Sequence, residues 1–207
     1  MNTLFSVCTL SLFAMATITD DANSCVQRGI ARFWEANLTG SLEAFAEAIA
    51  KDPRIEPYLW QRGICQYYSG QFQEGKRQFE VHKTVNPHDV ENALWHFLCV
   101  ARADGMDVAR QKMIQIDTKR DSRVPMAELY ALFSGDGAPE RVLAAADTAK
   151  TPLSAMYAHL YLGLYYEVAG DAANAEKHMR QAAAEKLDDV YMHDVADVHM
   201  QLRNWKP

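Results

Sequence analysis

Apolar residues recur at helical spacing through most of this chain. Between residues 40 and 51, for example, Leu42, Phe45 and Ile49 occupy one face of a helix. The residue before a proline leaves the helical region, so Pro53 marks the end of this helix. Similar periodic stretches alternate with short polar turns further along the chain. The pattern predicts an all-α fold built from consecutive helical pairs.

The pattern predicts about five helical pairs followed by one final helix. The first two pairs are expected at 25–37 with 40–51 and at 57–69 with 72–84. The third pair combines a helix between the turns at 86–89 and 104–105 with a short helix at 106–116. The remaining helices are expected at 125–133 and 139–149, in a pair around Gly163–Ala182, and at 189–202. The polar residues 117–124 are expected to form a loop. The last helix is expected to cover the apolar end of the stack.

The chain also repeats itself at a spacing of 34 residues, so that Gly29 and Phe45 in the first pair correspond to Gly63 and Phe79 in the second. This period is typical of tetratricopeptide repeats (TPRs), in which each helical hairpin buries its apolar face by stacking on its neighbours. We therefore expect a right-handed TPR-like solenoid of about five hairpins with a C-terminal capping helix, in a single domain over residues 23–207. The glycines are expected where the two helices of a hairpin cross closely.

Several short motifs extend this similarity beyond a general TPR pattern. They are Arg62-Gly63-Ile64, Tyr67-Tyr68-x-Gly70, Asn86-Pro87-x-Asp89, Leu94-Trp95 with Leu98, Tyr161-Leu162-Gly163-Leu164-Tyr165-Tyr166 and Ala169-Gly170-Asp171. With them, residues 53–200 resemble the NlpI-type TPR lipoproteins of the bacterial periplasm. The resemblance implies a non-enzymatic adaptor, usually a homodimer, that docks cell-wall hydrolases and a periplasmic protease. Neither Cys8 nor Cys25 has the sequence context of a lipidated cysteine, so a lipid anchor is not supported.

Residues 1–22 are predicted to be a signal or targeting segment. Leu4–Ile18 is apolar and rich in small residues, and Ala14-Met15-Ala16 has the form of a signal-peptidase site. No positive charge precedes the apolar run, and the alternative is an amphipathic capping helix that belongs to the solenoid. The first interpretation places the protein in the periplasm or outside the cell. Beyond this segment, no apolar run is long enough for an internal membrane span.

Composition and charge narrow the class of partner. Hydrophobic residues make up 49% of the chain and charged residues 23%, which is typical of a folded globular protein. The formal net charge is -6 and the basic residues are dispersed, so nucleic-acid binding is not expected. Cys65 and Cys99 would lie on stacked helices about 8–10 Å apart, whereas a disulfide needs Cα atoms within about 7 Å. Buried free thiols are therefore expected at Cys25, Cys65 and Cys99.

Aromatic residues are frequent in the first helix of each hairpin, which lines the concave face of a TPR fold. The residues expected to line a partner-binding groove are Phe33, Trp34, Trp60, Ile64, Tyr67, Tyr68, Arg102 and Tyr157. Large rigid rings bury much area at little entropic cost, so such a groove suits an extended or helical peptide. The alternative for any one ring is packing between repeats. Trp34, Trp60, Tyr67 and Tyr68 are the rings we expect to be exposed as a cluster.

The sequence holds no recognisable motif for catalysis, nucleotide binding or cofactor binding. His159 and His178 fall on the two helices of one hairpin and are expected to approach each other, and His193 lies on the final helix. These residues do not form a dense ligand set, so structural histidines are preferred over a metal site.

These features together favour a non-catalytic adaptor that binds a protein or peptide partner in its concave groove, without a cofactor or a metal. Two alternatives stay open. One is a cytoplasmic or organellar assembly scaffold of the same fold, which requires the N-terminal apolar run to be structural. The other is an enzyme or metal-binding protein that uses the region of His159, His178 and His193. A homodimer is implied by the family resemblance alone.

Overall fold

The computed structural model describes residues 21–205, and this part of the chain is helical, with no strand. Its elements are α1 (Ala22–Trp34), α2 (Leu38–Lys51), the 3-10 helix η1 (Pro53–Tyr58), α3 (Trp60–Tyr68), α4 (Phe72–His82), α5 (Val90–Asp104), α6 (Met106–Gln111), the 3-10 helix η2 (Thr118–Arg120), α7 (Met126–Ser134), α8 (Pro139–Ala149), α9 (Pro152–Val168), α10 (Ala172–Ala184) and α11 (Tyr191–Leu202). None of these helices is both long and apolar enough to span a membrane. The predicted signal segment lies, except for its last two residues, outside the described residues.

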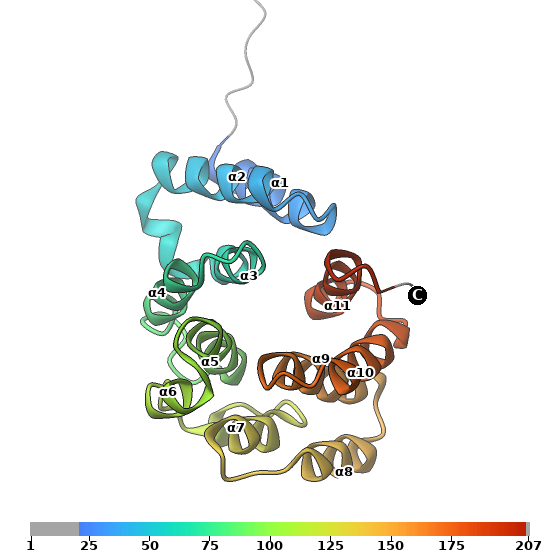
Figure 1. Ribbon diagram of the computed structural model, residues 1–207. Helices are drawn as coiled ribbons and strands as arrows, with labels where there is room; N and C mark the ends of the chain where they lie inside the picture. Colours follow the sequence, from blue (N-terminus) through green and yellow to red (C-terminus); the bar gives the residue numbers. More distant parts are fainter. Residues whose placement is uncertain (1–20, 206–207) are drawn as a thin grey trace, which may run out of the picture.

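Consecutive helices pack in pairs, which confirms the prediction from the hydrophobic pattern. The contacts join α1 with α2, α3 with α4, α5 with α6, α7 with α8, and α9 with α10. Figure 1 shows these pairs in an arc, with α3, α5 and α9 on its inner side. Polar side chains begin several of the helices: Asp21, Asn37 and Asp171 each accept a hydrogen bond from a backbone N–H three residues further along.

Several boundaries differ from the prediction, and three of them shorten a helix by three or more residues. Ala36 has a φ of 55° and Asn37 caps α2, so α1 is shorter than expected at its C-terminal end. The 3-10 helix η1 contains Pro57, and α3 begins only at Trp60. The short helix α6 ends at Gln111, five residues earlier than predicted.

Glycine allows the helices of a pair to cross closely, as predicted. A Cβ atom on Gly29 would lie 2.9 Å from Cε1 of Phe45, and one on Gly63 would lie 2.6 Å from Cζ of Phe79. Both distances are too short for van der Waals contact, so only glycine fits while the two rings keep their positions. The same crossing thus recurs in two successive pairs.

In the third pair a large ring occupies the position of the crossing glycine. Phe97 lies 34 residues after Gly63, and its side chain is fully buried. Its ring packs on Phe133 of α7, with 5.1 Å between the ring centroids. The side chain that would block a close hairpin crossing therefore contributes to the contact between α5 and α7.

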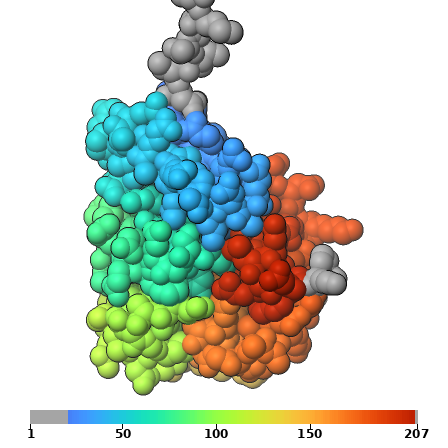
Figure 2. All heavy atoms as spheres, turned by 45° about the horizontal axis from the view of Figure 1, so that its top comes forward, coloured from blue at the N-terminus to red at the C-terminus, as the bar shows by residue number. Residues whose placement is uncertain are grey.

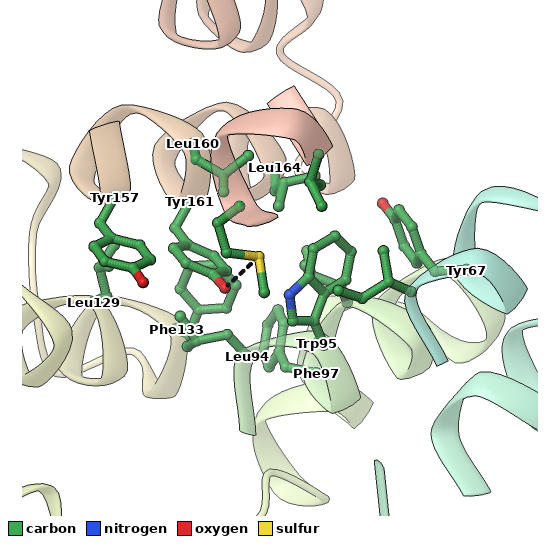
Figure 3. Close-up of a cluster of buried hydrophobic side chains, with 14 of the residues drawn as sticks. Tyr67, Leu94, Trp95, Phe97, Leu129, Phe133, Tyr157, Leu160, Tyr161 and Leu164 are labelled. Atoms are coloured by element: carbon green, nitrogen blue, oxygen red, sulfur yellow. Dashed lines mark hydrogen bonds between the residues drawn. The ribbon is translucent and has the colours of Figure 1, made fainter. Parts of the chain in front are cut away.

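Aromatic rings continue across the middle of the core. Figure 3 shows Tyr157 and Tyr161 of α9, Trp95 of α5 and Tyr67 of α3 in a row. Neighbouring centroids in this row are 6.4 Å, 6.4 Å and 5.5 Å apart. The rings connect helices that belong to three different pairs, so the hydrophobic core is continuous through the arc.

The final helix, α11, lies between the two ends of the arc (Figure 1). It packs on α9 and α10, as expected for a helix that covers the last hairpin, and it also packs on α1. Figure 2 shows this C-terminal segment, in red, against the blue N-terminal hairpin. Tyr68 of α3 and Nδ1 of His199, which are 131 positions apart, share a hydrogen bond of 3.0 Å. α11 therefore joins the last hairpin to the first two helical pairs.

Ionic contacts around Glu167 of α9 reinforce this closure. Its carboxylate accepts hydrogen bonds from Tyr67 Oη at 3.2 Å and from Arg203 Nε at 2.5 Å. Nη1 of Arg102 lies 3.9 Å away and Nε2 of His199 lies 3.7 Å away. Burial raises the pKa of Glu167, but Arg203 and the other nearby basic groups outweigh burial, so the net pKa is lowered.

The three cysteines of the described residues, Cys25, Cys65 and Cys99, are buried and form no disulfide with one another, which confirms the prediction of buried thiols. Cys8 lies outside the described residues.

Candidate functional site

The structure divides the predicted groove residues into exposed and buried groups. Trp34 is 46% exposed, which confirms its expected exposure, and Arg102 is also exposed, whereas Trp60 and Tyr68 are half-buried. The buried members are Phe33, Ile64, Tyr67 and Tyr157. Trp34, Trp60, Tyr67 and Tyr68 were expected to be exposed as a cluster, and this expectation is wrong for all but Trp34. The clearest departure is Tyr67. This side chain is 2% exposed because it packs on Trp95 and donates a hydrogen bond to Glu167.

The sequence interpretation missed Tyr191, the first residue of α11, which contacts several of the predicted groove residues. Its ring stacks on Phe33 at 6.2 Å and meets Trp60 edge-on at 4.8 Å, measured between ring centroids. It also lies 6.2 Å from Trp34. α11 thus occupies space that we expected a partner to fill.

A signal for this contact was present in the sequence. Tyr191, Val195, Val198 and Leu202 recur at helical spacing and give the final helix an apolar face. This apolar face predicts that the final helix packs against other helices, but it does not identify those helices.

Tyr191 lines two cavities, which we call the outer groove and the inner cavity. The outer groove, of 630 Å³, lies between α1 and α11. It is lined by Gln27, Ile30, Trp34, Asp189, Tyr191, Asp194, Asp197, Val198 and Gln201. The inner cavity, of 290 Å³, is lined by Trp60, Phe79, His82, Asp89, Glu91, Asn92, Trp95, Arg123, Tyr157, Val190, Tyr191 and Met192.

The outer groove combines an exposed ring with acidic side chains. Trp34 comes from α1, and Asp189, Asp194 and Asp197 come from α11 and the turn before it. None of the described residues that line the groove is a lysine or an arginine. Partial burial raises the pKa of Asp194, and two neighbouring aspartates act in the same direction. The groove therefore favours a ligand that brings both an apolar group and positive charge.

A partly buried ionic cluster lies at one side of the inner cavity. The guanidinium group of Arg123 donates hydrogen bonds to Asp89 and Asp121, both at 2.6 Å, and to Glu91. Tyr161 Oη donates to Glu91 Oε1 at 2.5 Å. Burial raises the pKa of Glu91 to about 7, although Arg123 acts to lower it. The cluster fixes the start of α5 against the segment that carries Arg123.

His159 and His178 lie side by side, which confirms that they approach each other. Their Nδ1 atoms are 2.9 Å apart, so one ring donates a hydrogen bond to the other. Burial lowers the pKa of both rings, to about 4 for His178. His193 instead directs Nε2 toward the carbonyl oxygen of Ala183, at 3.3 Å. Within residues 21–205, no group of three or more potential ligand side chains could hold a metal ion.

The comparisons with known proteins give no family for this chain. It matches no protein-family model, and a search of curated proteins finds no match. The resemblance to NlpI-type TPR proteins thus stays a prediction from the sequence motifs.

Proposed function

We propose that this protein is a non-catalytic adaptor with a TPR-like solenoid fold, and that it binds a peptide segment of a partner protein in the outer groove. The observation that carries the proposal is the exposed ring of Trp34 in an acidic groove of 630 Å³. The partner segment would present an apolar or aromatic side chain next to a lysine or an arginine.

The repeated helix crossing supports the TPR-like part of the proposal. Gly29 with Phe45 and Gly63 with Phe79 make the same contact 34 residues apart, which is the period of these repeats. In this reading α11 is the capping element that solenoids need at an apolar end. It differs from a simple cap because it also contacts the first hairpin.

The chemistry of the groove supports recognition by a protein partner. Tryptophan is enriched at the centres of protein interfaces because it combines a large apolar area with a polar N–H group. Asp189, Asp194 and Asp197 can pair with basic groups of the partner and steer its approach. Asp194 and Asp197 belong to α11 and Asp189 to the turn before it, so they line the same groove as the ring of Tyr191.

The family resemblance supports a more specific form of the proposal. In this form the partner is a cell-envelope hydrolase or a protease, and residues 1–22 direct the chain out of the cytoplasm. The adaptor would act by raising the local concentration of one enzyme near another or near its substrate.

The proposal is tested by affinity capture with the full chain as bait, followed by mass spectrometry and by anisotropy titration of a labelled peptide from each captured protein. The Trp34→Ala bait should lose the partner, and the affinity of the peptide should fall by about 2 kcal/mol, or about thirtyfold. Tyr58→Ala is the matched control because Tyr58 is 61% exposed and does not line the groove.

Each result has a definite meaning. Capture of hydrolases or a protease that depends on Trp34 would support the adaptor in its cell-envelope form. Capture of chaperones or cytoplasmic complexes would favour the alternative of a cytoplasmic scaffold. Equal affinity of the native chain and the Trp34→Ala variant for every captured partner would rule out the outer groove as the docking surface.

A further inference from the structure

Three buried polar atoms of residues that line the inner cavity have no hydrogen-bond partner within residues 21–205. They are Nε2 of His82, Oδ1 of Asn92 and Nε1 of Trp95. These three residues are 5%, 3% and 1% exposed. Buried polar atoms are almost always paired, because an unpaired atom loses its hydration without replacement. Three such atoms on residues that line one cavity make this cavity a candidate site for a polar ligand.

The hydrogen bonds that His82 and Asn92 already make determine whether their unpaired atoms donate or accept. Nδ1 of His82 lies 2.8 Å from the carbonyl oxygen of Pro57, so the tautomer with its proton on Nδ1 leaves Nε2 as an acceptor, 4.0 Å from Oδ2 of Asp89. Nδ2 of Asn92 donates to the carbonyl oxygen of Phe79 at 3.0 Å, which leaves Oδ1 as an acceptor. Nε1 of Trp95 can only donate. The cavity thus needs a ligand with at least two N–H or O–H donors and one acceptor.

The electrostatics of the cavity favour a cation. The carboxylates of Asp89 and Asp121 alone outnumber the single guanidinium group of Arg123, and Glu91, whose pKa is raised to about 7, adds to them when it is ionised. The surplus of negative charge is accompanied by aromatic walls, which attract cations through their ring faces. The rings that line the cavity are those of Trp60, Phe79, Trp95, Tyr157 and Tyr191.

We propose that the inner cavity binds a small primary ammonium compound that also carries a neutral hydrogen-bond acceptor, such as an amino-acid amide or an amino alcohol. The ammonium group supplies three donors, which suit His82 Nε2, Asn92 Oδ1 and the nearby carboxylates. A carbonyl or hydroxyl oxygen of the ligand accepts from Trp95 Nε1. The volume of 290 Å³ limits the ligand to a small molecule, since ligand sites usually measure about 300–1,000 Å³. A quaternary ammonium compound lacks the donors, and a free carboxylate meets repulsion.

This proposal does not depend on peptide binding in the outer groove. The two sites are separated by Tyr191 and are lined by different residues apart from it. Either one can fail while the other holds.

The first test compares two probes on the full-length native protein. Isothermal titration calorimetry with L-phenylalaninamide should show saturable binding, and N-acetyl-L-phenylalaninamide should bind at least about tenfold more weakly. Acetylation removes the charge and two N–H donors while it preserves the ring and the amide. Absence of saturable binding, or equal binding of the two probes, would overturn the proposal and leave a cavity that holds water only.

The second test uses variants that remove one free atom each. His82→Asn can still donate to the Pro57 carbonyl but lacks the acceptor at Nε2, and Trp95→Phe loses only the N–H group and part of the ring. Each variant should weaken the binding of L-phenylalaninamide at least about fivefold. His96→Asn is the matched control, because His96 is a buried histidine that lies outside both cavities.

Circular dichroism establishes that each variant is folded before the titration. An unchanged affinity in folded His82→Asn and folded Trp95→Phe would contradict the proposed contacts, as would an equal loss in the His96→Asn control.

Discussion

At Gly29 and Gly63 the helix crossing leaves room for a hydrogen atom and for nothing larger. The obstacle is in both cases the edge of a phenylalanine ring on the second helix, 2.6–2.9 Å from where a Cβ atom would lie. Gly163 of the last pair is less crowded, since a Cβ atom there would lie 3.0 Å from Cε of Met179. Protein interiors are densely packed, so an added side chain at these positions must displace the ring or separate the helices.

Gly29→Leu should therefore lower the free energy of unfolding by at least about 3 kcal/mol, because overpacking forces the ring of Phe45 out of its position. Ala31→Leu adds a leucine two residues further along the same helix, at an exposed position. It should change the free energy of unfolding by less than about 0.5 kcal/mol. Urea denaturation of both variants measures the difference. Equal stabilities would mean that the crossing adapts without cost.

α11 is held in place by rings and by one buried histidine. Tyr191 packs at its N-terminal end and His199, which is 0% exposed, lies near its C-terminal end beside Tyr68. Burial lowers the pKa of His199 to about 4, although the Glu167 carboxylate acts in the opposite direction. The ring is thus neutral in the folded protein at neutral pH, and its protonation opposes the docking of α11.

This lowered pKa predicts acid sensitivity. As the pH falls from about 6.5 to about 4, His199 takes up a proton in the unfolded chain but not in the folded protein, so the folded state loses stability. The loss approaches about 3 kcal/mol for this one group. Urea denaturation at pH 7, 5.5 and 4.5 should show a steeper decline for the native protein than for His199→Gln. The same slope for both proteins would contradict the assignment.

Local patterns predicted the helical pairs and their glycine crossings, since both depend on residues within one repeat. The position of α11 was not predictable in this way, because the contact of Tyr68 with His199 joins residues 131 positions apart. The cluster around Arg123 was missed for a related reason. Residues 117–124 are polar and indicate a loop, and only the folded chain shows that Arg123 meets Asp89 and Glu91.

The arc of helices and the helix that closes it form one connected structure. Glu167 of α9 links α3, α5 and α11 within it. Its carboxylate contacts Tyr67 of α3, Arg102 of α5, and His199 and Arg203 at the C-terminal end of α11. The Glu167 side chain is only 13% exposed, and removing its charge leaves the partly buried guanidinium groups of Arg102 and Arg203 without their counter-charge.

Glu167→Gln should lower the free energy of unfolding by about 2–4 kcal/mol, since Arg102 and Arg203 lose their shared counter-charge. Glu176→Gln is the comparison variant, because the ion pair of Glu176 with Arg180 is half-exposed and lies within a single helix. Its effect should stay below about 0.5 kcal/mol. Differential scanning calorimetry of the two variants would contradict the proposed role of Glu167 if their unfolding temperatures were lowered equally.

The ring of Tyr191 is a common wall of the outer groove and the inner cavity. A ligand that shifts this ring from one side changes the shape offered to a ligand on the other side. Thermodynamic linkage then makes the effect mutual, so that each ligand alters the affinity of the other by the same factor. If both proposals hold, the affinity for a peptide partner would change with the occupancy of the inner cavity by the small ammonium compound.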